Sequence, residues 1–180
     1  MSSPIVPITL PAASADLYVQ VADALTNDTD EAAGVLAALG NGDKSLYPNF
    51  DTPGPSADRT VCPVPFIVCV NGGIRALDKQ TREHRVHIEV HDEADYGNER
   101  IAGLIERIKE FLIAYEWRPA DQAPYVRYAS GLQFESESPL LQDETYNTNV
   151  IQVTLLARAT DRTSNRGQGK MAGPNATPGG

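Results

Sequence analysis

The chain has 180 residues, of which 41% are hydrophobic and 22% charged, and its net charge at pH 7 is −9. This length supports one domain with a hydrophobic core and is short for two. The last twenty residues hold one acid and three bases, a net of +2, so residues 1–160 carry −11. A body this acidic repels phosphate backbones, which argues against general nucleic-acid binding.

Cysteine usage and the opening segment bear on the compartment. The odd spacing of Cys62 and Cys69 places them on opposite faces of an extended strand, so we expect two free, buried thiols in a reducing compartment. The opening MSSPIVPITLP has neither the basic start nor the apolar run of a signal peptide, and no segment resembles a membrane span of roughly 20 apolar residues. These features predict a soluble protein made in a cytoplasm.

Residues 1–60 are expected to form an N-terminal arm, short helices and a long loop. A first helix is predicted after Ser14, a candidate N-cap, because apolar residues follow it at helical spacing. A second short helix is predicted at DEAAGVLAALG, where the final glycine ends it. The next segment, NGDKSLYPNFDTPGPSADRT, is rich in helix and strand breakers and predicts a long loop.

The core domain is expected over residues 61–160. Its first strand is predicted at VCPVPFIVCV, with both faces at least partly buried and its start at a sheet edge because of the two prolines. The following NGG predicts a turn. In the next stretch, EHRVHIEVHDE, the apolar Val86, Ile88 and Val90 alternate with polar residues, which indicates a strand with one buried face.

A long amphipathic helix is predicted from about Asn98 to Trp117. Apolar residues follow the spacing i, i+3, i+4, i+7 without a gap, charged residues occupy the opposite side, and Pro119 ends the helix. The apolar series is Ile101, Leu104, Ile105, Ile108, Phe111, Leu112 and Tyr115.

Two further strands, YVRYASGLQF and NVIQVTLLARA, complete the core domain. Residues 161–180 have too little apolar content to fold and are expected to form a flexible tail. The element order predicts an α+β fold. We expect a mainly antiparallel four-stranded sheet with the long helix and the short N-terminal helices packed on one face, and flexible arms at both ends.

All three histidines lie between residues 84 and 91, and His87, Glu89 and His91 share one face of the predicted strand. Two histidines at this spacing can bind one zinc ion, with Glu89 or Asp92 as a further ligand. The chain has no other histidine, and its cysteines lack ligand spacing. We therefore interpret the polar residues as the solvent or partner face of a strand. A metal-dependent enzyme and a pH-sensing cluster are the less favoured alternatives.

No other pattern predicts a catalytic set or a cofactor site. The glycines of VNGGIRAL lack phosphate-loop spacing, and Ser130 lacks the full Gly-x-Ser-x-Gly pattern of a nucleophile elbow. Glu135, Glu137, Asp143 and Glu144 lie in FESESPLLQDE, which predicts a solvated acidic hairpin tip rather than an acid–base pair. The long arms favour a protein whose neighbouring subunits order them by strand addition or wrapping.

The core, residues 61–160, resembles the tail terminator, or tail-completion, proteins of long-tailed bacteriophages. The likeness is carried by PFIVCVNGG, the strand REHRVHIEVHDE, the helix ERIAGLIERIKEFLIAYEW and the hairpin GLQFESESPLLQDETYNTNVIQVTLLARA. In that family, a strand with a pattern like VHIEV precedes a helix of this kind, and a polar, acidic loop then leads into a last long strand. The likeness covers a little over half of the chain.

The resemblance implies a structural virion protein without catalysis or cofactor. Six subunits, as a rule, form a ring that caps the tail tube, stops its polymerisation and presents a docking surface to the head or neck. DNA passes through the lumen, and the chain reaches the virion from the host cytoplasm. A polar face of Arg85, His87, Glu89 and His91, with the acidic residues Glu135, Glu137, Asp143 and Glu144, is then expected at a subunit interface or the lumen.

Two further hypotheses about the function remain. A related neck component, such as a head-closure or connector protein, uses similar small folds. A small-ligand or peptide-binding module with an open sheet edge also fits the element order.

Overall fold

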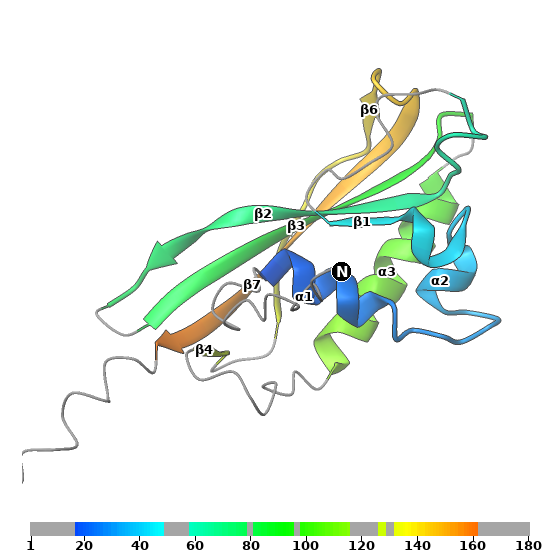
Figure 1. Ribbon diagram of the computed structural model, residues 1–180. Coiled ribbons are helices and arrows are strands. Elements are labelled where there is room, and N and C mark those ends of the chain that lie inside the picture. The colour runs from blue at the N-terminus through cyan, green and yellow to red at the C-terminus, as the bar shows by residue number, and fades with distance from the viewer. Residues whose placement is uncertain are drawn as a thin grey trace, which may run out of the picture.

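The computed structural model describes residues 17–48, 58–78, 81–95, 98–115, 126–128 and 132–161. Within these ranges a seven-stranded sheet carries helices on one face (Figure 1). The elements in chain order are α1 (Leu17–Leu25), α2 (Val35–Ala38), the 3-10 helix η1 (Gly42–Ser45), β1 (Leu46–Pro48), β2 (Phe66–Ala76), β3 (Thr81–Glu93), α3 (Asn98–Ala114), β4 (Val126–Tyr128), β5 (Gln133–Glu137), β6 (Leu141–Asp143) and β7 (Thr148–Asp161).

Three long strands, β2, β3 and β7, form the centre of the sheet. The middle strand, β3, is antiparallel to both neighbours, so that Val90 lies opposite Ile67 on one side and Ile151 on the other. The short β1 runs parallel to β2 along its outer edge, and β4, β5 and β6 each pair with β7 along the opposite edge. The sheet is therefore mixed but mainly antiparallel.

The α+β class is confirmed, and the expected number of strands is too low. The predicted strand YVRYASGLQF is observed as two strands, β4 and β5. In addition, β1 and β6 form in segments whose composition predicted loops. Both are only three residues long and depend on pairing with a long neighbour, which local composition does not reveal.

The main hydrophobic core lies between the sheet and the helices. On β3, the side chains of Val86, Ile88 and Val90 are fully buried, at 0% exposure, as their alternation predicts. The buried stripe of α3 packs against them and consists of Ile101, Leu104, Ile105, Ile108 and Leu112. Burying one such side chain stabilises the fold by roughly 1.5–3 kcal/mol.

Of the two predicted N-terminal helices, the first is present over Leu17–Leu25 and the second is shorter than the sequence predicts. The α1 helix packs on β2, β3 and α3, and its proposed cap, Ser14, lies outside the described residues. The α2 helix has four residues and contacts α3 and η1. Asp28 fixes the connection between α1 and α2, because its carboxylate accepts the backbone N–H of Val35 and pairs with Arg107 of α3 at 2.6 Å.

The NGG sequence does not form the predicted turn. Asn71, Gly72 and Gly73 lie inside β2, where a β-bulge adds one residue between Asn71 and Ile74 relative to β3. Gly73 has φ +96°, a backbone conformation that glycine adopts at low cost. The strand then continues to Ala76, so the β2–β3 hairpin is longer than expected and extends away from the helices (Figure 1).

A second, smaller cluster lies on the face of the sheet opposite the helices. Cys62, Phe66 and Val68 are buried there, with Tyr47, Val64, Val70 and Tyr146 packed around them. Cys62 precedes β2 instead of sharing a strand with Cys69, which lies within β2 in the main core; both thiols are free and buried, as predicted, and they lie in different clusters. Burial raises the pKa of the Cys69 thiol to about 12. No helix in the described ranges is long and apolar enough to cross a membrane.

Candidate functional site

The candidate site is the polar face of β3, defined by Arg85, His87, Glu89 and His91. These residues alternate with the buried valines and isoleucine of the strand, so they point away from the helices. The matching face of β7 places Thr154 opposite His87 and Gln152 opposite Glu89. The sequence prediction that these four residues share one face is confirmed by the strand register.

Arg85 connects β3 with β5 across the intervening strand β7. Its guanidinium donates to both carboxylate oxygens of Glu135, at 2.8–3.2 Å, and lies 3.2 Å from Glu83 of its own strand. The hydrogen bond from Arg85 brings a residue of the predicted acidic loop onto the polar face. Glu135 is thus part of a strand and an ion pair rather than of a free hairpin tip.

His87 and Glu89 each bind the residue directly opposite on β7. The Nδ1 atom of His87 lies 2.9 Å from the Thr154 hydroxyl, and the Gln152 amide donates to Glu89 at 3.0 Å. The His91 imidazole, with its Nε2 atom 3.7 Å from Glu89, and the Gln152 amide together lower the pKa of the Glu89 carboxyl. These cross-strand pairs fix the register of β3 against β7.

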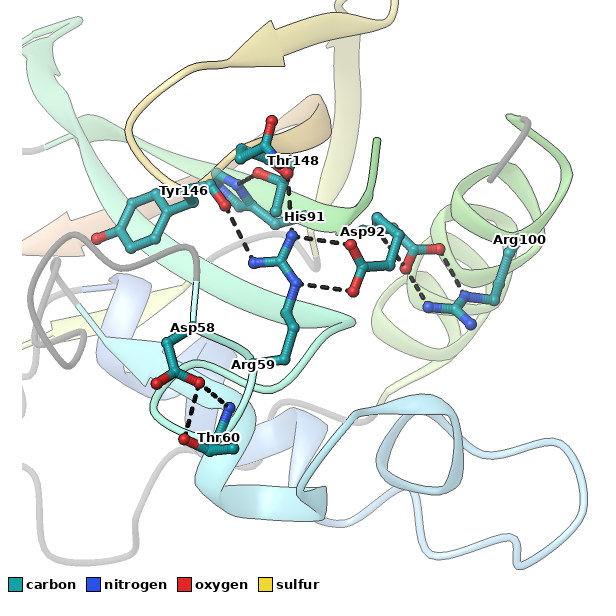
Figure 2. Close-up of polar contacts among 10 residues, drawn as sticks. Asp58, Arg59, Thr60, His91, Asp92, Arg100, Tyr146 and Thr148 are labelled. Carbon is teal, nitrogen blue, oxygen red and sulfur yellow. Dashed lines mark hydrogen bonds and ion pairs between the residues drawn. The ribbon is translucent and has the colours of Figure 1, made fainter. Parts of the chain in front are cut away.

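His91 differs from the other three residues because it is buried, at 2% exposure. Its ring stacks on Phe66 at 4.4 Å with an interplanar angle of 9°, and Tyr146 contacts it edge-on. Its Nδ1 atom lies 2.9 Å from the Thr148 hydroxyl (Figure 2). His91 is therefore part of the second hydrophobic cluster as well as of the polar face.

Arg59 closes the end of the site beside His91. Its guanidinium binds both carboxylate oxygens of Glu93 at 2.7 and 2.9 Å and donates to the backbone carbonyls of Tyr146 and Asn147 (Figure 2). The hydrogen bond from Arg59 lowers the pKa of the Glu93 carboxyl. One side chain thereby joins the segment before β2, the end of β3 and the turn between β6 and β7.

The other acidic candidates lie in different places. Asp143 of β6 lies 3.9 Å from His91, and together with Glu89 and Glu144 it lines a groove of about 310 Å³ beside β6. Glu137 points to the helix side, where it binds Lys109 of α3 at 3.0 Å. The prediction of one solvated acidic loop is therefore wrong, because β5 and β6 pair with β7 and distribute these residues over both faces.

The arrangement does not form a metal site in the described residues, where no group of three histidine, cysteine or carboxylate side chains lies close enough to hold an ion. The Nδ1 atoms of both histidines on this face are bound to threonine hydroxyls. Chemically, the polar face is a network of cross-strand hydrogen bonds and ion pairs. Such a network stabilises a surface and sets its charge pattern.

Sequence reasoning missed the residues that organise this face. Arg59 lies in a segment read as loop, and the stacking partner Phe66 comes from β2. Thr148 and Thr154 could have been found, because the alternation of the last strand places its polar residues on one side. Their pairing with the histidines depends on the neighbouring positions of β3 and β7, which the sequence alone does not give.

Comparisons with known proteins support the fold. No protein-family model matches the chain, and no curated protein matches it. Among solved structures, the fold is similar to a chain in the virion of a native gene transfer agent particle, with a TM-score of 0.56 and 16% identity. The similarity covers 84% of this chain and 98% of that chain, so it extends over nearly the whole of the solved fold.

Proposed function

We propose that the protein is a structural component of a phage-like virion, and specifically a tail terminator that forms a ring at the end of the tail tube. The observation that carries this proposal is the fold similarity to a chain of a gene transfer agent virion, which spans 98% of that chain. The resemblance of the core sequence to tail terminator proteins points to the same class independently of that structure.

The charge of the protein supports a position on the path of DNA. Residues 1–160 carry a net charge of −11, so a ring of several copies repels the DNA that moves through its lumen. In this proposal DNA passes without specific binding. The partners of the protein are other copies of itself, the tail-tube protein and a head-completion or neck protein.

The polar face fits a structural role. Arg85, His87 and Glu89 are hydrogen-bonded to side chains of β5 and β7, and the groove beside β6 is open to solvent rather than a deep, enclosed pocket. We propose no catalysis and no cofactor. The acidic residues beside the groove, the partly buried Asp143 and the exposed Glu144, are candidates for the subunit interface or the lumen.

The experiment is a tube-polymerisation assay with the tail-tube protein of the same virus. Adding the protein at a substoichiometric amount is expected to shorten the tubes and to leave it bound at one end of each. A variant in which the helix core is disrupted, Ile108→Asp, serves as the matched control because it removes the folded domain. Tubes of unchanged length, with the protein unbound, would contradict the terminator role. Binding to tailless heads but not to tubes would identify a neck component instead.

A further inference from the structure

Both edges of the sheet contain a stretch of strand that no other strand of the described residues covers. On one edge, β1 pairs only with Ile67–Cys69 of β2, so the outer side of β2 from Val70 to Ala76 has no partner strand in the described part of the chain. On the other edge, the outer side of β5 is equally uncovered, and all five of its residues are exposed. Uncovered edges are the usual sites for adding a strand from another chain.

The two edges have compatible directions. Along the order β2, β3, β7, β5, every neighbouring pair is antiparallel, so β5 runs opposite to β2. A second copy placed beside β5 in the same orientation presents its own β2 antiparallel to β5. Repeating this step is a head-to-tail arrangement, which closes into a ring when the rotation allows it.

Each of these edges contains a β-bulge, and the two bulges match in one register. In β2, one extra residue lies between Asn71 and Ile74. In β5, one extra residue lies between Phe134 and Ser136. A bulge on one edge alone hinders pairing with a regular strand. If Phe134 lies opposite Ile74 of the second copy, the extra residue of β5 lies opposite the extra residue of β2.

In this register, two exposed apolar side chains meet on the helix side of the sheet. Phe134 lies opposite the buried Leu155 within its own chain, and Ile74 lies opposite His84, so both point to the helix side. These two side chains are unusually exposed for their size, at 45% and 50%. Pairing them across the two copies removes both from water, as aromatic and β-branched cross-strand pairs do.

On the opposite face of the sheet, this register brings an arginine of one copy close to a glutamate of the other. Arg75 of β2 is exposed and forms no ion pair within the described residues; its backbone pairs with Glu83 of β3. In the proposed register, Arg75 lies opposite Gln133 of the other copy and diagonal to Glu135. Glu135 lies opposite Gly73, whose missing side chain leaves room for it. Glu137 lies opposite Asn71, so the contact ends before the stretch of β2 that β1 covers.

We propose that β5 of one copy pairs antiparallel with residues 71–75 of β2 in a second copy, with Phe134 opposite Ile74. The inference rests on the proposed function only for the identity of the partner as a second copy. It assigns the surface that joins neighbouring subunits, and it makes the sheet continuous from one copy to the next.

The test uses two variants of the full-length protein that each add one cysteine, Ile74→Cys and Phe134→Cys. Within one chain these positions are separated by β3 and β7, three strand spacings or roughly 14 Å, so they cannot form an intrachain disulfide. The native Cys62 and Cys69 are buried and free, so they do not interfere. Mild oxidation of the mixed variants is expected to give a covalent dimer, and neither variant alone gives one.

Gln133→Cys mixed with Ile74→Cys is the matched control, because these side chains point to opposite faces and should not crosslink. Arg75→Glu places a carboxylate beside Glu135 and is expected to weaken self-association about tenfold, whereas Arg75→Gln weakens it less. Crosslinking of Phe134→Cys with itself would overturn the pairing, since it indicates a two-fold contact.

The results separate the pairing from the proposed function. Rings that form without the Ile74–Phe134 crosslink would overturn the proposed strand pairing but not the proposed ring. This outcome would include the case in which the N-terminal arm pairs with the strand edge instead. Crosslinked open filaments without rings would support the pairing and count against the terminator. Protein that stays monomeric at every concentration, alone and with tail tubes, would overturn both.

Discussion

At the scale of single residues, Arg59 is a side chain that joins three separate segments of the chain. It connects three chain segments through Glu93 and two backbone carbonyls, at positions 34 to 88 residues away in sequence. The side chain is three-quarters buried, so these charge-assisted bonds are only partly screened by solvent.

Arg59→Met is expected to lower the free energy of unfolding by about 1–3 kcal/mol, because it removes the bonds and leaves two carbonyls and a carboxylate without their donor. Urea denaturation at pH 7 measures the loss. Arg75→Met, which removes an exposed arginine outside this contact, is the matched control and should change the stability by no more than about 0.5 kcal/mol. Equal effects of the two changes would contradict the role of Arg59.

The same pair predicts a pH dependence. The pKa of Glu93 is lower in the folded protein than the ordinary value of about 4.3–4.5, chiefly because of the hydrogen bond from Arg59. Its stabilisation is therefore complete above that ordinary value and is lost as the pH falls through the folded pKa. Unfolding free energies measured between about pH 6 and 3 should fall less steeply in Arg59→Met. Parallel curves for the two proteins would be evidence against this linkage.

Gly72 is a residue whose side-chain position is already filled. A Cβ atom there would lie 2.8 Å from the Cβ of Arg85 and 2.9 Å from the Nε2 of His87. Gly72→Ala should therefore destabilise the protein by on the order of 1–3 kcal/mol and disturb the polar face. Thermal unfolding checks this, and an unchanged melting temperature would mean that the bulge rearranges freely.

The sequence predicts which residues share the polar face, because strand alternation depends only on neighbours in the chain. It does not predict that His91 is buried. Burial follows from the stacking of Phe66 and from Tyr146 and the cover of residues 58–65, all of which are brought in by tertiary pairing. For the same reason, the acidic residues were expected in a single loop although Glu135 and Glu137 face opposite sides of β5.

At the scale of elements, α3 is the helix on which the main core depends. Its stripe of apolar residues was predicted in full, and the structure ends the helix at Ala114 instead of Trp117. The prediction agrees with the structure here because apolar residues recur at helical spacing throughout the seventeen residues of α3. Elements of three or four residues, such as β1, β6 and α2, have no period of their own and form only where a longer element receives them.

Ile108→Ala is expected to cost about 2–5 kcal/mol, because Ile108 is fully buried between α3 and the sheet and the change leaves a cavity. Ile113→Ala on the same helix is the control, since Ile113 is 52% exposed and its truncation leaves no cavity. Chemical denaturation compares the two. A similar cost at both positions would mean that the packed face of α3 is assigned wrongly.

Gly103 lies in the middle of α3, with nothing within 4 Å of the position that a Cβ would occupy. Gly103→Ala should stabilise the protein by about 0.5–1 kcal/mol, since alanine loses less backbone entropy than glycine in a helix. The same change thus has opposite signs at Gly72 and Gly103. A destabilised Gly103→Ala protein that is still folded and monomeric would contradict the open environment of this position.

At the scale of the whole molecule, the fold alone does not name a function, because one fold supports many. The proposed function combines the acidic body, a fold similarity that spans nearly all of a virion chain, and a sheet that has an uncovered stretch on each edge among the strands that the structure describes. The overall α+β class followed from the element order. The edges and their bulges could not be read from the sequence, where NGG indicates a turn.

In the proposed function, copies of this protein assemble into a ring on the tail tube. Electron microscopy of the purified protein, mixed with tubes of the tail-tube protein from the same virus, tests it most directly. We expect closed rings, each seated on one end of a tube whose growth has stopped. Tubes with bare ends that continue to grow, beside protein that remains monomeric, would contradict it.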